Sequence, residues 1–298
     1  MRCEPFAATC LHVRLLPRAQ WVLRLVAVVM LMAASMGIHA AVLTASNTAG
    51  NNHRGNMFDL LVNQNVAITQ FEVSPMGNMP YEIHYKEGTW VGHANDPGAW
   101  ELMQAGDVAY TGGFAPVPLA EPIILSANQT HGFYITSATT AVSLNYSNGT
   151  NVGNVYSSDA VMTFYEGGGM EYPFTQGTGA VYQPRVWNGA IHYEVIGAAT
   201  QFAITAPATV NQGMAFDFEV VAQDANGFRD PSYAGTVHFT STDPNADLPT
   251  DVTLVAGRGT FQATLDAIGD QAITATDTVT PVLAGTSAAI NVWPVHVV

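Results

Sequence analysis

Short runs in which apolar and polar residues alternate recur along this chain from about residue 41 onward. Gly, Pro and Asn separate the runs, and no long stretch places apolar residues at helical spacing. Alternation with a period of two puts one face of a β-strand in a core and the other face in solvent. The clearest runs are residues 66–73, 81–85, 132–136, 141–146, 190–195 and 216–222. The pattern predicts an all-β fold built from antiparallel strands.

Glycine-containing segments predict how some of these strands are joined. Asn148-Gly149 and Asn188-Gly189 are typical of two-residue hairpin turns, because the pair tolerates the positive φ that such turns require. Residues 167–169 are three consecutive glycines without the following Lys or helix of a phosphate loop. We expect this glycine segment to be a flexible turn.

The first forty residues differ from the rest of the chain. They contain the only cysteines, Cys3 and Cys10, and four of the nine basic residues, and an apolar run covers residues 25–34. A basic segment, a short apolar run and a small-residue exit are typical of an export signal. The run is well short of the roughly 20 residues of a spanning helix, and an N-terminal anchor is the alternative. We expect residues 1–40 to be a cleaved signal peptide, no membrane span in the mature chain, and an extracellular or cell-surface protein.

The chain beyond residue 40 is strongly acidic and contains no cysteine. It has 5 basic and 22 acidic residues, which gives a formal charge of −17. This charge repels phosphate groups, so nucleic acid and anionic membrane surfaces are poor partners. Because no disulfide can form, buried apolar area must stabilise the fold, and the length suggests one or two domains.

A change in composition divides the expected strands into two sets. Tyr and Trp are abundant before residues 197–200, whereas Tyr233 and Trp293 are the only ones after this seam. We expect residues 41–196 to form a jelly-roll-like β-sandwich that serves as a binding domain. The later part has about seven short strands with frequent turns, which is the pattern of an immunoglobulin-like sandwich over residues 201–294.

The second half contains sequence segments that are recognisable beyond their strand pattern. The segments concerned are residues 206–210, 222–227, 233–244 and 272–277. They closely resemble bacterial Ig-like repeats of large secreted and surface proteins. The resemblance implies a sandwich used as a spacer, stalk or adhesive module, and it brings no catalytic residues. Such repeats usually occur in tandem, whereas this sequence has one.

The first half resembles, more loosely, a β-sandwich domain of bacterial exported proteins of unknown function. The segments that carry this likeness are residues 56–60, 132–136, 144–150 and 184–189. The resemblance implies a fold and an exported location, and it implies no activity.

Sequence motifs for catalysis are lacking. The chain has no nucleophile elbow, no His-Glu-x-x-His and no dinucleotide fingerprint, and no two histidines have metal-ligand spacing. A sugar hydrolase needs two carboxylates, for which Glu82 with Glu87 and Glu166 with Glu171 are candidate pairs. A surface this acidic produces such pairs by chance, so we expect the protein not to be an enzyme.

Aromatic residues of the first half are the candidate ligand-binding residues. Trp90, Trp100 and Trp187, with Tyr85 and Tyr165, lie near expected strand ends or loops. Flat rings stack well on sugar faces, and Tyr and Trp add a polar group for hydrogen bonding. The alternative is that these rings close the ends of the sandwich core.

Aspartates of the second half are candidate ligands for calcium, the one metal that the sequence suggests. Asp224, Asp230, Asp243, Asp247 and Asp251 are concentrated in two loop segments. Oxygen-rich loops suit a cation that takes six to eight ligands. The alternative is that these residues cap turns through their own backbone, which is common for Asp.

Together these features predict a non-enzymatic secreted or cell-surface binding or adhesion protein. Its expected partner is a glycan or a component of a cell surface or matrix. Two alternatives remain open at this point: a carbohydrate-active hydrolase or its accessory module, and a structural spacer or matrix component.

Overall fold

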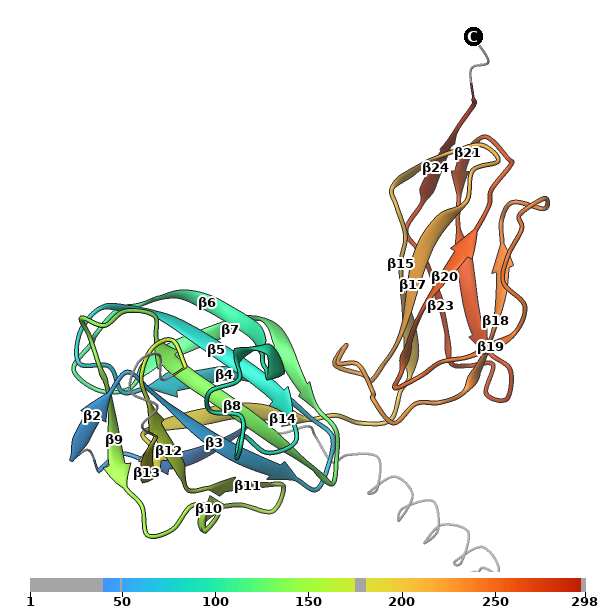
Figure 1. The fold of residues 1–298 in the computed structure, drawn as a ribbon. Helices are drawn as coiled ribbons and strands as arrows, with labels where there is room; N and C mark the ends of the chain where they lie inside the picture. The colour runs from blue at the N-terminus through green and yellow to red at the C-terminus, as the bar shows by residue number, and fades with distance from the viewer. Residues whose placement is uncertain (1–39, 49, 175–180, 296–298) are drawn as a thin grey trace, which may run out of the picture. The chain divides into compact units, whose positions relative to one another are not determined.

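The structure is a computed structural model that describes residues 40–48, 50–174 and 181–295 (Figure 1). The segment expected to be a signal peptide lies outside these residues, apart from Ala40. The described residues form β-strands, turns and one short 3-10 helix, η1 (Pro97–Ala99). The all-β fold expected from the alternating runs is confirmed.

The strands between residues 41 and 195, here called the first strand set, form two antiparallel sheets. The smaller sheet has the order β1 (Ala41–Ser46), β14 (Gly189–Val195), β4 (Val66–Val73) and β7 (Ala115–Leu125). The larger sheet has the order β2 (Asn51–His53), β9 (Leu144–Asn148), β13 (Tyr182–Trp187), β12 (Gly167–Met170), β3 (Gly55–Val62), β8 (Gln129–Ser137), β5 (Met79–Glu87) and β6 (Glu101–Val108). Strand β11 (Met162–Tyr165) also pairs with β3, and β10 (Val155–Ser158) pairs with β11.

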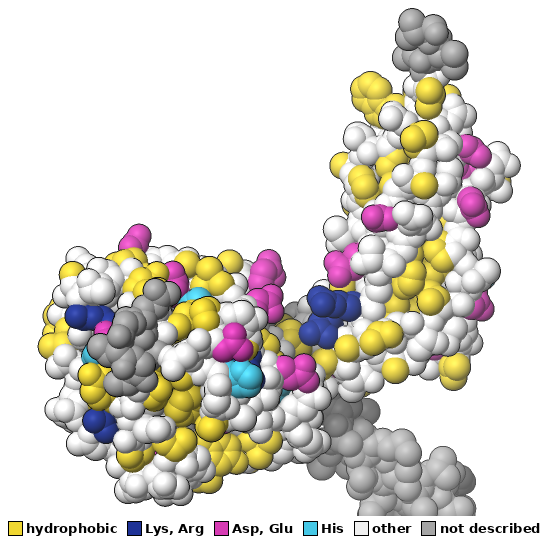
Figure 2. Space-filling model, in the orientation of Figure 1, with side chains coloured by type: hydrophobic (Ala, Val, Ile, Leu, Met, Phe, Trp, Pro, Cys, Tyr) yellow, Lys and Arg dark blue, Asp and Glu magenta, His cyan; other side chains and the backbone are white. Residues whose placement is uncertain are grey.

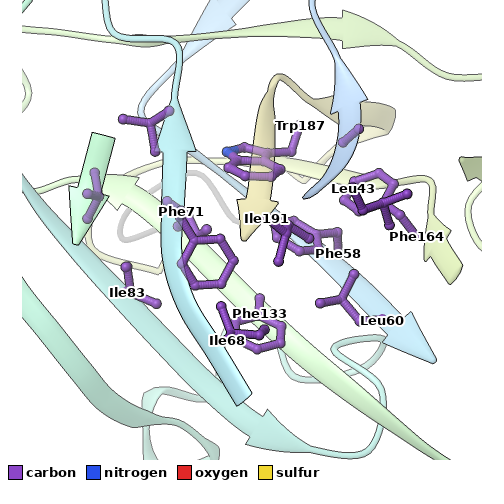
Figure 3. Close-up of a cluster of buried hydrophobic side chains, with 14 of the residues drawn as sticks. Leu43, Phe58, Leu60, Ile68, Phe71, Ile83, Phe133, Phe164, Trp187 and Ile191 are labelled. Carbon is purple, nitrogen blue, oxygen red and sulfur yellow. The ribbon is translucent and has the colours of Figure 1, made fainter. Parts of the chain in front are cut away.

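The main core lies between these two sheets. Phe58, from the larger sheet, stacks on Trp187 with ring centroids 5.1 Å apart, and Phe71, from the smaller sheet, meets Trp187 edge-on at 6.0 Å. Figure 3 shows these three rings converging with Phe133. The alternation in β3 explains the arrangement, because Phe58 and Leu60 face this core while Met57 faces the opposite side of the sheet.

Neither Asn-Gly pair makes the hairpin that the sequence predicts. Strand β9 ends at Asn148 but pairs with β13 and β2, and the chain runs on to Val155 before the next strand begins. At Asn188-Gly189 the chain passes from β13 in the larger sheet to β14 in the smaller one. A side chain at Gly189 would collide with the Trp187 indole and the Glu72 carbonyl oxygen. The glycine is therefore required by close packing at a crossing between sheets, not by a tight turn.

The expectation of a flexible turn at the three glycines is also wrong. They form strand β12, fully buried, between β3 and β13. A Cβ on Gly167 would collide with the Met57 carbonyl oxygen, and one on Gly168 would lie 2.7 Å from Val181 Cγ1 and 3.0 Å from Trp90 Cη2. Glycine is needed here because other chain segments pack directly on the backbone of this strand.

The strands between residues 201 and 293, the second strand set, form three further sheets. One has the order β15 (Gln201–Thr205), β17 (Phe216–Gln223) and β20 (Arg258–Ala263). Another has the order β19 (Val252–Thr253), β18 (Thr236–Ser241), β22 (Ile273–Asp277) and β23 (Ala284–Thr286). In the third, β24 (Ile290–Trp293) lies between β21 (Gly269–Gln271) and a parallel partner, β16 (Thr209–Asn211).

A second core joins the β15–β17–β20 sheet and the β19–β18–β22–β23 sheet into a sandwich. Phe218 of β17 and Phe239 of β18 meet edge to face at 5.4 Å, and Phe261 of β20 lies 5.2 Å from Phe239. The strands that contribute these rings alternate between core and solvent, as their sequence predicts.

A buried histidine links two strands of the larger sheet in the first strand set. His131 Nε2 donates to the Ser126 carbonyl oxygen at 3.0 Å, and its Nδ1 lies 2.9 Å from the Tyr85 hydroxyl, which donates to it. Burial lowers the pKa of His131, although the Ser126 carbonyl and the Glu87 carboxylate oppose the shift. Burial, with Glu87 and Glu101, raises the pKa of Tyr85 to about 12. The imidazole is therefore neutral in the folded protein at pH 7.

Acidification below pH 6.5 should destabilise the protein through His131. The unfolded chain binds a proton at this site with a pKa near 6.5 while the folded chain resists it, so stability is full above pH 6.5 and falls as the pH decreases. Urea unfolding at pH 7.5 and pH 5 should show this loss, and H131Q should reduce it. An equally steep loss in H131Q would contradict the assignment to His131.

G167A should destabilise the fold strongly. The new methyl group would meet the Met57 carbonyl oxygen inside the sheet, and overpacking of this kind costs roughly 1–3 kcal/mol or more. G113A is the matched control, because a Cβ there has nothing within 4 Å and Gly113 is exposed. Equal melting temperatures for the two variants would show that β12 tolerates a side chain.

Candidate functional site

A second aromatic cluster covers the side of the larger sheet that faces away from the main core. Its members come from four neighbouring strands and two covering segments: Met57, His84, Trp90, Trp100, Tyr134, Met170 and Phe174. The strand register explains the assembly, since His84, Tyr134, Met57 and Gly168 lie opposite one another across β5, β8, β3 and β12. We call this group the outer-face cluster.

The segment from residue 88 to residue 100 is fastened over this face by a partly buried carboxylate. Asp59 accepts hydrogen bonds from Thr89 Oγ1 at 2.5 Å and from the Trp90 backbone N–H at 2.9 Å. Burial raises the pKa of Asp59, and these two bonds and Lys86 oppose the shift. Because Gly168 has no side chain, the Trp90 indole lies directly over β12.

A chain of polar groups borders the cluster. His84 Nε2 donates to Glu82 Oε2 at 2.9 Å, and the Tyr172 hydroxyl donates to Glu82 Oε1 at 3.0 Å. The His84 ring stacks on Tyr134 with centroids 5.5 Å apart and meets Phe174 edge-on at 5.0 Å. Each oxygen of Glu82 therefore already has a donor, and the carboxylate is held in one orientation.

Tyr134 joins the strands to the segment that covers them. It is fully buried, and its hydroxyl donates to the Glu171 carbonyl oxygen next to Tyr172. Burial raises the pKa of Tyr134, so the hydroxyl stays protonated and keeps this bond. The bond positions Tyr172 beside Glu82.

Trp100 is the tryptophan of the cluster that remains partly exposed. Its ring lies 6.4 Å from Tyr134 and 6.1 Å from Phe174, and its indole N–H is bound to the His93 carbonyl oxygen at 2.9 Å. Since the N–H is already used, the ring offers a ligand its apolar surface. Leu102, opposite His84 in the strand register, is 53% exposed and extends this apolar surface.

A further group of side chains lies around strand β2, at the end of the larger sheet. His53 Nε2 lies 3.2 Å from Glu171 Oε1, and the His53 ring meets Tyr182 edge-on at 4.8 Å. Burial lowers the pKa of His53 against the opposing effect of the Glu171 carboxylate. Tyr182 is 41% exposed and so offers another accessible ring.

The structure corrects the predicted aromatic site. Trp187 and Trp90 are 1% and 3% exposed, so neither presents a ring face at the surface. Tyr85 packs against the main core and Phe133, and Tyr165 lies on β11 opposite Val155 and is not a member of the outer-face cluster. Of the five residues, Trp90 and Trp100 come together, and Trp100 keeps accessible ring surface.

The residues that the sequence did not single out for this site are Glu82 with His84 as a pair, Tyr134, Tyr172 and Phe174. A signal for the pair is present, because Glu82 and His84 are two residues apart in a strand and so share a face. The sequence does not say that this face carries aromatic rings from other strands.

The predicted carboxylate pairs have other partners. Glu166 is 4% exposed and accepts bonds from the Thr150 and Asn151 backbone N–H groups, which caps the turn after β9. Glu171 pairs with His53, as described above. Glu82 is held by His84 and Tyr172. These contacts give a structural role to Glu82, Glu166 and Glu171, three of the four carboxylates from which a hydrolase would be built.

The five predicted calcium ligands are not brought together. Asp224, Asp230 and Asp243 are buried, and each accepts bonds from backbone N–H groups of its own loop. Asp247 and Asp251 are exposed, and Asp251 lies 2.7 Å from His238 Nδ1. In the part of the chain that the structure describes, no group of three metal-binding side chains occurs. Turn capping, the alternative, accounts for the three buried aspartates.

Asp243 shows how strongly one carboxylate ties a loop. Its oxygens accept the backbone N–H groups of Asn245 at 2.9 Å, Asp266 at 2.5 Å and Ala267 at 2.8 Å. Desolvation by itself would raise the pKa of Asp243, but the three N–H donors outweigh it and the pKa is lowered. The charged carboxylate therefore connects the turn after β18 to the turn after β20.

Comparisons with known proteins do not assign this chain to a family. No protein-family model matches the chain, and no curated protein matches it. A beta-glycosidase from Bacteroides vulgatus is similar in structure, with a TM-score of 0.31 and 13% identity over 72% of this chain and 22% of that chain. A protein described as membrane-anchored, from Corynebacterium diphtheriae, has a TM-score of 0.26 and 13% identity over 87% of this chain and 53% of that chain. The chain thus spans about a fifth and about half of these two proteins, and likenesses this distant carry no inference about activity.

Among the residues that the structure describes, no helix has the length and apolarity to cross a bilayer.

D243A should destabilise the second strand set by about 1–3 kcal/mol, because it leaves three backbone N–H groups without their acceptor. D247A, at an exposed position, is the matched control and should change stability little. Urea unfolding with calcium and with a chelator measures both effects. If the lower stability of D243A appears only when calcium is present, or is reversed by calcium, the metal is favoured over the cap.

Proposed function

We propose that this protein is a non-enzymatic secreted or cell-surface binding or adhesion protein whose first strand set holds a glycan at the outer-face cluster. The observation that carries the proposal is the partly exposed ring of Trp100 beside the ordered Glu82–His84–Tyr172 chain. A sugar presents an apolar face and a rim of hydroxyl groups. The cluster offers apolar ring surface for the first and fixed polar groups for the second.

The bonding of the carboxylates favours binding over hydrolysis. A glycosidase needs one carboxylate free to donate a proton and another about 5 to 9.5 Å away. Both carboxylate oxygens of Glu82 already accept hydrogen bonds, and the Glu166 carboxylate accepts hydrogen bonds from backbone N–H groups of a turn. A carboxylate fixed in this way still has lone pairs that accept hydrogen bonds from sugar hydroxyls.

The charge of the protein supports a neutral or cationic partner. Figure 2 shows acidic side chains scattered over the visible surface of both strand sets, with few Lys and Arg side chains. With a formal charge of −17 beyond residue 40, the protein repels nucleic acid and anionic lipid. A glycan without acidic groups avoids this repulsion.

The second strand set is proposed to be a single module of the bacterial Ig-like repeat type that acts as a spacer. The support comes from its alternating strands, its buried core and its aspartate-capped loops. The core includes the phenylalanine, valine and isoleucine residues Phe202, Phe218, Val220, Val237, Phe239, Ile273, Ile290 and Val292. Export by the N-terminal segment would place both parts outside the cell.

W100A should weaken glycan binding roughly tenfold or more while leaving the fold intact, because stacking on this ring contributes about 1–3 kcal/mol. The comparison variant is W187A, which should destabilise the protein by about 3–5 kcal/mol because it leaves a cavity in the main core. A glycan array identifies the ligand, and titration calorimetry then compares the variants. If W100A lowers the melting temperature as much as W187A and binding is unchanged, the spacer alternative replaces this proposal.

A further inference from the structure

Strand β20 has one side without a strand partner. On its other side it pairs with β17, and Gly259, Phe261 and Ala263 lie opposite Val220, Phe218 and Phe216. The Ala222 N–H bonds to the Gly257 carbonyl oxygen, so the odd-numbered residues of this segment direct their backbone groups toward β17. The even-numbered residues direct theirs away from it.

The outward backbone groups are bonded only at the two ends of β20. Arg258 exchanges hydrogen bonds with Val255 at one end, and Thr264 exchanges bonds of 2.9 and 3.0 Å with Asp247 at the other. Between them, no hydrogen bond among the described residues uses the outward N–H and C=O groups of Thr260 and Gln262. Both residues are exposed.

A groove lies along this open part of the strand. Its volume is about 390 Å³, and it is lined by Ala215, by residues 247–249 and by residues 261–264. Leu248, Pro249 and Phe261 give it an apolar floor. The chain leaves β20 uncovered because residues 252 and 253 pair with β18 in the opposite sheet.

Open strand edges are usually blocked in natural proteins by proline, lysine or a bulge. Edge strand β7 contains Pro116, Pro118 and Pro122, and it also has a register irregularity. Strand β20 has no proline, no lysine and a regular register with β17. Its edge is therefore chemically ready to accept another strand.

The charges beside the groove select the kind of strand that fits. Asp217 lies opposite Gln262 and Glu219 opposite Thr260, on the solvent face of the sheet, and Asp247 lines the groove itself. The inner side of the groove is apolar. A strand that alternates basic and apolar residues would place the basic ones on the solvent face, across β20 from Asp217 and Glu219, and the apolar ones toward Leu248 and Phe261.

We propose that β20 is a docking edge for an extended peptide with alternating basic and apolar residues, which adds to the sheet as an antiparallel strand. Antiparallel addition continues the order of β15, β17 and β20. The peptide residues opposite Thr260 and Gln262 point their side chains to the solvent face, as Thr260 and Gln262 do. These positions are the basic ones, and they also exchange the backbone hydrogen bonds with β20. This site is separate from the glycan site proposed for the first strand set and does not depend on it.

The probe is the peptide acetyl-Val-Lys-Val-Lys-Val-amide, whose two lysines match Thr260 and Gln262, added to the full chain. Amide hydrogen exchange at Thr260 and Gln262 should slow at least tenfold at saturation, with a smaller change at Phe261, which already bonds to β17. Two modified peptides test the geometry. N-methylation of the lysines should abolish binding, whereas N-methylation of the valines, whose N–H groups point away from β20, should leave it within about threefold.

Protein variants test the same site from the other side. D217N combined with E219Q should weaken peptide binding severalfold, and Q262P should abolish it by removing one outward N–H. If Q262P does not fold, the two N-methylated peptides still test whether the peptide binds at β20. Equal binding of both N-methylated peptides, protection at another strand, or no binding at millimolar peptide would overturn the proposal.

Discussion

The packing of Trp187 against Phe58 and Phe71 is the contact on which the first strand set depends. Its indole fills the space between the two sheets at the point where the chain passes from one to the other. The crossing is possible because Gly189 has no side chain to collide with the indole. A single aromatic residue and the glycine two positions later thus fix how β13 and β14 are placed, and with them the inner faces of both sheets.

The outer-face cluster follows from the same sheet. Once Phe58 and Leu60 face the main core, Met57 and Asp59 must face the opposite side. Asp59 then holds the Thr89–Trp90 segment, and the bare backbone of Gly168 receives the indole of Trp90. The candidate site is therefore built on strands and covered by segments that are hydrogen-bonded to them, which is the arrangement that keeps binding groups in fixed positions.

In the second strand set, buried aspartates hold the loops beside the aromatic core. Asp243 and Asp277 each bind N–H groups of the loops beside them, and Asp277 also accepts the Tyr233 hydroxyl. Desolvation opposes the charge on Asp277, yet its donors lower its pKa, so the charged carboxylate is the form that the fold stabilises. Both ends of β20 are hydrogen-bonded to the residues beside them. The strand therefore keeps one open edge while the sandwich stays intact.

The sequence alone determined the all-β class and the location of many strands, such as β4 and β17, because period-two alternation is a local property that each segment carries by itself. It also raised turn capping as one use of the aspartates, since that contact joins residues close in the chain. Tertiary structure decided what depends on distant partners. The glycines of β12 and Gly189 serve close packing, Trp187 and Trp90 are buried, and Glu82 and His84 meet aromatic rings from β8 and the Phe174 segment. Which strand lies beside which is set by the combined burial of side chains far apart in sequence, and no single segment contains that information.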